Sequence, residues 1–157
     1  MSRFIIALVS FGLLAGACND ASHDEHAAHQ NGYAPVLKTR EDTLFHEVMK
    51  GHDAGMAKVG KLRKNIDETT HRLDSLGKLP AEKVDAAYKQ ALTNLQTDLK
   101  NADEEMDSWM QKFKLDSMAD NKELRIKYLE GERVKVTAVK EHILSVLQQA
   151  DSLLKRQ

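Results

Sequence analysis

The chain has 157 residues, of which 41% are hydrophobic and 30% are charged, and this length suits a single small domain. Its 23 basic and 24 acidic side chains give a formal net charge of −1, so the sequence lacks the basic excess typical of nucleic-acid binding. Because it contains one cysteine, it can form neither an internal disulfide bond nor a zinc site made of cysteines.

Residues 1–17 have the plan of a secretory signal peptide. Arg3 precedes an apolar run, Phe4 to Leu14, that is too short to cross a bilayer as a permanent helix. Small residues then lead to Cys18, an arrangement that resembles the signal of bacterial lipoproteins, in which the cysteine is lipidated and becomes the first residue of the mature protein. We therefore predict export and lipid anchoring at Cys18 to the cell envelope, with the outer membrane as the expected site. An ordinary cleaved signal with a free Cys18 is the alternative.

Residues 18–39 are expected to form a flexible tether between the membrane and the folded domain, since they are polar and show no helical or strand period. The tether carries His23, His26 and His29 at three-residue spacing. Such a run can bind Cu(II), Zn(II) or Ni(II) loosely. A solvating spacer that contains histidine by chance is the alternative.

The pattern at about residues 40–76 predicts one long amphipathic helix. Two series of core positions repeat every seven residues along it: Phe45, His52, Val59, Ile66 and Leu73, and Val48, Gly55, Leu62, Thr69 and Leu76. Thr39 or Asp42 can cap its start, and Gly77 suits the left-handed position after its end.

Residues 80–115 and 120–155 predict two further helices. The first of these has Pro80 in its first turn and core positions at spacings of four and three: Tyr88, Leu92, Leu95, Leu99, Ala102, Met106, Trp109 and Phe113. Asp120 or Asn121 can cap the last helix, whose core positions are Leu129, Val136, Ile143 and Ala150, with Val139, Val146 and Leu153.

Short turns joining three helices, each about 50 Å long, predict an all-α fold, an elongated antiparallel three-helix bundle. A dimeric coiled coil is the structural alternative, and the sequence indicates no particular oligomeric state.

Hairpin geometry brings the unusual side chains of the chain to one end of this bundle. Antiparallel helices rise equally per residue, so His52 is expected level with Met106, and Met106 level with Tyr128. The residues expected at this end are His52, Met49, Met56, Met106, Trp109, Met110 and Tyr128.

This cluster has two interpretations, copper binding and packing. Thioether sulfur and neutral imidazole suit Cu(I), and an aromatic face can shield a soft cation. The copper hypothesis takes as ligands His52, Met56 and Met106 with Met49 and Met110, and as a lid Trp109 and Tyr128. Packing alone is the preferred interpretation, because methionine fills irregular cores and packs well against aromatic rings. Asp53, Glu105 or Glu132 would then satisfy the imidazole of His52. Gly51 and Gly55 would allow close backbone approach or leave room for a ligand.

The sequence lacks the sets of residues that other metal sites and the common catalytic sites require, so it predicts a protein that is not an enzyme. Glu68 and His71 form one Glu-x-x-His pair, whereas a di-iron bundle needs two. Neither a Gly-x-Ser-x-Gly motif nor a catalytic cysteine is present.

Three short motifs carry a family resemblance: His52-Asp53-x-x-Met56, then Ala102-Asp103-x-x-Met106-x-x-Trp109-Met110-x-x-Phe113, then Tyr128-Leu129. Together they resemble small bacterial lipoproteins often labelled "viral A-type inclusion protein repeat", over about residues 42–150. The resemblance implies a lipid-anchored helical domain of the cell envelope and no established substrate. The leading hypothesis is a non-catalytic binding or scaffold protein with an envelope protein as partner, and the alternative is an envelope copper-binding protein.

Overall fold

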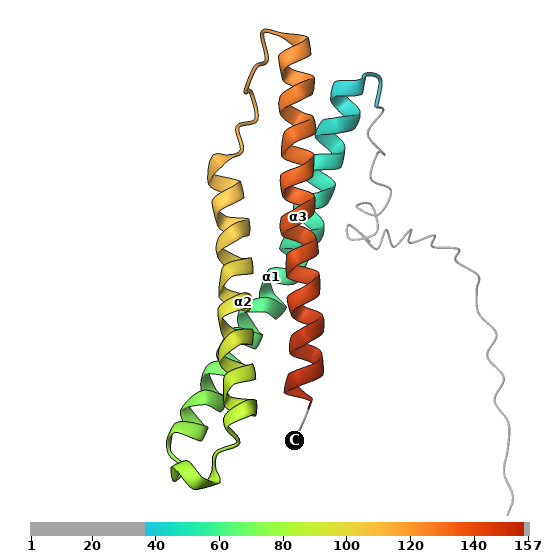
Figure 1. Ribbon diagram of the computed structural model, residues 1–157. Helices are drawn as coiled ribbons and strands as arrows, with labels where there is room; N and C mark the ends of the chain where they lie inside the picture. The colour runs from blue at the N-terminus through green and yellow to red at the C-terminus, as the bar shows by residue number, and fades with distance from the viewer. Residues whose placement is uncertain (1–36, 156–157) are drawn as a thin grey trace, which may run out of the picture. The chain divides into compact units, whose positions relative to one another are not determined.

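The computed structural model describes residues 37–155, which form three long helices packed against one another (Figure 1). Helix α1 spans Arg40–Gly77, α2 spans Ala86–Lys112, α3 spans Lys122–Leu154, and a 3-10 turn, η1, spans Ala81–Lys83. Consecutive helices run in opposite directions, which confirms the predicted three-helix bundle, and the described residues contain no strand. The predicted signal peptide, Cys18 and the tether histidines His23, His26 and His29 lie outside the described residues.

The N-cap of α1 is Thr39, one of the two predicted caps, and it forms a capping box with the other, Asp42. The Thr39 hydroxyl accepts a hydrogen bond from the Asp42 backbone N–H at 3.1 Å, and the Asp42 carboxylate accepts one from the Thr39 N–H at 3.0 Å. The hydrogen bonds with Thr39 are also the main reason why the pKa of Asp42 lies below its ordinary value.

The prediction that Gly77 follows α1 in the left-handed conformation is wrong. Gly77 is the last helical residue, and Lys78 follows it with right-handed backbone, φ −88°. The Lys78 N–H closes the last turn on the Ser75 carbonyl at 3.2 Å, so the chain leaves the helix without a left-handed residue.

The second helix begins later and ends earlier than predicted. Pro80 precedes the short turn η1 and is not in the first turn of α2. The N-cap is Asp85, whose carboxylate accepts hydrogen bonds from the N–H groups of Ala87 and Tyr88 at 2.9 and 3.1 Å. At the other end Phe113 is already extended. Asn121 caps α3 as predicted.

The core follows the predicted seams, with two charged exceptions. The series Val48, Gly55, Leu62 and Thr69 is buried on α1, and the positions from Leu92 to Trp109 are buried on α2. In the other predicted α1 series only Val59 is buried, whereas Phe45, His52, Ile66 and Leu73 are half-buried. Arg125 and Glu132 continue the spacing of the α3 seam and are each only 5% exposed. Burial of charged side chains is costly unless they are hydrogen-bonded, so both residues need partners.

Candidate functional site

Four rings from three helices form a continuous series, the aromatic stack, made of His52 on α1, Trp109 on α2, Phe113 at its end and Tyr128 on α3. The ring centres of His52 and Trp109 are 5.6 Å apart, those of Trp109 and Phe113 4.9 Å, and those of Phe113 and Tyr128 6.2 Å. The structure therefore brings together His52, Trp109 and Tyr128, three of the residues expected at one end.

The buried carboxylate of Glu132 lies against this stack. Trp109 Nε1 donates a hydrogen bond to one oxygen at 3.0 Å, and Lys135 Nζ donates to the other at 2.8 Å. The bond to Glu132 raises the pKa of the exposed Lys135. Two donors on two oxygens explain how this charge is accommodated in the core.

His52 has a partner on its own helix. Its Nδ1 atom lies 2.9 Å from Asp53 Oδ1, and Asp53 is one of the three carboxylates expected to satisfy it. The other two are engaged elsewhere, Glu132 with Trp109, and Glu105 with His142 Nδ1 at 2.8 Å.

The methionines of the predicted copper site have different surroundings. Met106 is fully buried, and its terminal methyl occupies the place where a Cβ on Gly55 would stand. Met56 is 37% exposed, whereas Met49 and Met110 are partly buried. For both sulfur atoms to bind one copper ion, the exposed Met56 side chain would have to turn inward toward the buried Met106.

Within residues 37–155, no three His, Cys, Asp or Glu side chains converge to hold a metal ion. At Gly55 the Met106 side chain fills the space that the glycine leaves, and the Cα of Lys140 on α3 lies 3.9 Å from the place of a Cβ.

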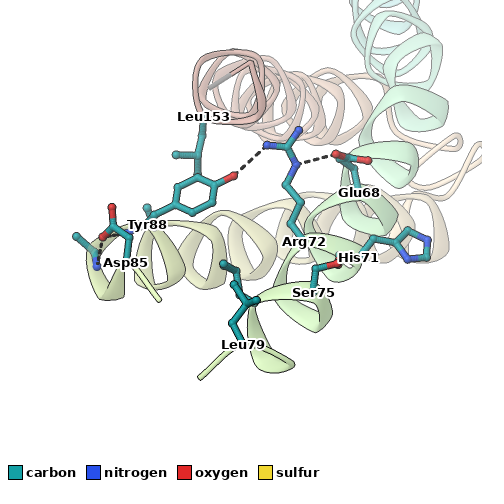
Figure 2. Close-up of a pocket in the computed structure, with 11 residues that line it drawn as sticks. Glu68, His71, Arg72, Ser75, Leu79, Asp85, Tyr88 and Leu153 are labelled. Carbon is teal, nitrogen blue, oxygen red and sulfur yellow. Dashed lines mark hydrogen bonds and ion pairs between the residues drawn. The ribbon is translucent and has the colours of Figure 1, made fainter. Parts of the chain in front are cut away.

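A second feature, the groove, lies near the other end of the bundle and has a volume of about 960 Å³. It is lined from all three helices by Glu68, His71, Arg72, Ser75, Leu76, Leu79, Asp85, Ala87, Tyr88, Ala91 and Leu153. Figure 2 shows the Tyr88 hydroxyl pointing toward the Arg72 guanidinium, which also faces Glu68. The sequence did not predict this groove, because it depends on where η1 and the Asp85 cap turn the chain.

Arg72 joins the three helices at the groove. Its guanidinium donates to the Glu68 carboxylate at 2.7 Å, to the Tyr88 hydroxyl at 2.9 Å and to the Leu154 carbonyl at 2.8 Å. The bonds to Tyr88 and then to Glu68 raise the pKa of Arg72. The Leu154 carbonyl belongs to the last turn of α3, whose carbonyls lack helical partners and attract a positive charge.

The Glu-x-x-His pair lies on the groove without forming a metal site. Glu68 is bound to Arg72, and His71 is exposed at the rim, where its carbonyl accepts a hydrogen bond from the Ser75 hydroxyl at 2.8 Å.

Comparisons with protein-family models, curated proteins and solved structures find no match. The resemblance to the lipoprotein family therefore stays a prediction. In the part of the chain that the structure describes, each helix falls short of the length or apolar character that a membrane span needs.

Proposed function

We propose that the protein is a non-catalytic binding module of the bacterial cell envelope, anchored by lipid at Cys18, and that its groove receives an apolar segment of an envelope protein. The position of the groove is the observation that supports this best. Arg72 lies about 48 Å along α1 from Arg40, at 1.5 Å per residue. The predicted tether joins the bundle at Arg40, so the groove lies at the end of the bundle away from that junction.

The chemistry of the groove favours an apolar ligand over a charged one. Its charged groups have partners within the protein, because Arg72 binds Glu68 and the Asp85 carboxylate caps α2. Leu79 is 46% exposed there and remains available for contact. Full burial of one leucine-sized side chain of the partner in the groove would contribute about 1.5–3 kcal/mol to the free energy of binding. We assign no reaction to the groove, because both carboxylates are already engaged.

Photo-crosslinking in cells tests this proposal. A photoreactive amino acid replaces Leu79 in the groove, and the matched control replaces Val134, an exposed apolar residue on α3 outside the groove. We expect a discrete protein adduct from position 79 and none from position 134. The absence of an adduct at 79 across growth conditions, or equal adducts at both positions, would contradict the proposal.

The captured protein then provides a binding test in purified form. Ala91→Trp places a large ring in the groove, and we expect it to weaken binding about 10-fold or more, which corresponds to 1.4 kcal/mol. Unchanged affinity in this variant would place the contact elsewhere.

A further inference from the structure

Exposed apolar side chains gather at the end of the bundle opposite the groove. Leu115 is 64% exposed and Met118 52% exposed in the loop of residues 113–121, which joins α2 to α3. Leu37 before α1 and Leu124 in the first turn of α3 are exposed as well. We call these four side chains the apolar tip.

A buried arginine holds the parts of the tip together. Arg125 donates to the Glu41 carboxylate at 3.2 Å and to the Ser117 carbonyl at 2.9 Å, and its guanidinium lies 5.8 Å from the centre of the Tyr128 ring. These contacts join the start of α1, the loop and the start of α3, and Figure 1 shows the loop rising past the end of α2 to the beginning of α3. The four apolar side chains therefore belong to one end of a fixed structure.

The loop holds one of these side chains out at a conformational cost. Met118 has φ 59° and is the only non-glycine residue with positive φ in residues 37–155. Glycine adopts this left-handed backbone more readily than any residue with a side chain. Since Met118 is more than half exposed, burial within the bundle does not offset the strain. Strained residues of this kind cluster at active sites, ligand clamps and switch regions.

We propose that the apolar tip docks on the lipid bilayer that carries the Cys18 anchor. The inference rests on the proposed function, which supplies that anchor. Leu37 belongs to the last residues of the predicted tether, three positions before α1, and is itself part of the tip. If the tether is flexible as predicted, its root-mean-square span would be about 25 Å, which would hold the tip nearest the membrane.

The charges around the tip are balanced. Residues 112–124 carry three lysines, at 112, 114 and 122, and three acids, at 116, 120 and 123. Apolar contact, not attraction to anionic head groups, therefore drives the docking. We expect it to occur on zwitterionic lipid and to depend little on salt.

The experiment uses the full acylated protein reconstituted in zwitterionic vesicles. Met118→Cys carries a polarity-sensitive fluorophore, and Val134→Cys, exposed on α3 away from the tip, is the matched control. Acylation blocks Cys18, so each variant takes a single label. We expect the label at 118 to shift to the blue and to be quenched by lipids brominated in their acyl chains, while the label at 134 shows neither change.

Vesicle flotation separates the failures. Protein that floats while the label at 118 stays in water overturns the docking and leaves the anchor standing, whereas protein that does not float overturns both. A blue shift without quenching by brominated lipid shows that the tip meets a second copy of the chain, and it also overturns the docking.

Leu115→Ser with Leu124→Ser is expected to reduce the quenching at 118 about two-fold or more, because the apolar contact is lost. The thermal unfolding midpoint should stay unchanged, since both side chains are exposed.

Discussion

Two glycines on α1 have different roles because different groups face them. A Cβ on Gly55 would overlap the terminal methyl of Met106, the far end of a flexible but fully buried side chain, which would therefore have to move. A Cβ on Gly60 would meet nothing within 4 Å. The first glycine therefore makes room for a core side chain, whereas the second only weakens the helix.

Alanine substitution should separate these roles. We expect Gly60→Ala to raise the free energy of unfolding by about 0.5–1 kcal/mol through helix propensity. Gly55→Ala should lower it by about 1 kcal/mol or more, because the displaced Met106 side chain overpacks the core. Urea denaturation of both variants measures the difference. Equal stabilisation by the two substitutions would show that the Met106 side chain moves aside without a cost in stability.

The placement of the methionines also bears on the copper hypothesis. Because Met106 is packed on Gly55 and Met56 is exposed, we expect His52→Ala and Met106→Leu to leave the affinity of the full chain for Cu(I) unchanged. Titration against a competing chelator measures that affinity, and thermal unfolding checks that each variant is folded. Loss of one tightly bound Cu(I) in both variants would establish the copper site instead.

At the scale of the helices, periodicity could predict what depends on one helix at a time. The α2 seam and the caps Thr39 and Asn121 are local in sequence, so spacing and residue type were enough. Arg125 and Glu132 also occupy seam spacings, but a charged side chain is buried only where partners from other elements satisfy it. A repeating pattern contains no information about those partners.

Acid should weaken the cap of α1. The pKa of Asp42 is lower in the folded protein than its ordinary value of 3.8, so its contribution to stability is present above that value and is lost as pH falls through the folded pKa. Asp42→Asn cannot titrate. We expect its free energy of unfolding to fall less than that of the parent between about pH 5 and pH 2. Urea denaturation across this range measures both, and parallel curves would rule out the Asp42 contribution.

At the scale of the whole bundle, two arginines join the elements at opposite ends, Arg125 at the apolar tip and Arg72 at the groove. We expect Arg72→Met to lower the free energy of unfolding by about 1.5–3 kcal/mol, the range for hydrogen bonds to a charged group, and Tyr88→Phe to lower it by about 0.5–1.5 kcal/mol. A double-mutant cycle measured by urea denaturation gives their coupling. Strictly additive effects would show that the bond between Arg72 and Tyr88 adds nothing of its own.

Docking of the tip would also set the direction in which the bundle points. The groove lies about 48 Å along α1 from Arg40, so a bundle standing on its tip holds the groove far from the lipid. With a donor on Leu79→Cys and acceptor-labelled lipids, we expect little energy transfer in the parent and more when Leu115→Ser and Leu124→Ser free the bundle to tilt on its tether. A donor on Met118→Cys is the control and should transfer strongly in the parent. Equal transfer from position 79 with and without the tip substitutions would mean that the lipid anchor alone, and not the tip, governs how the groove is presented.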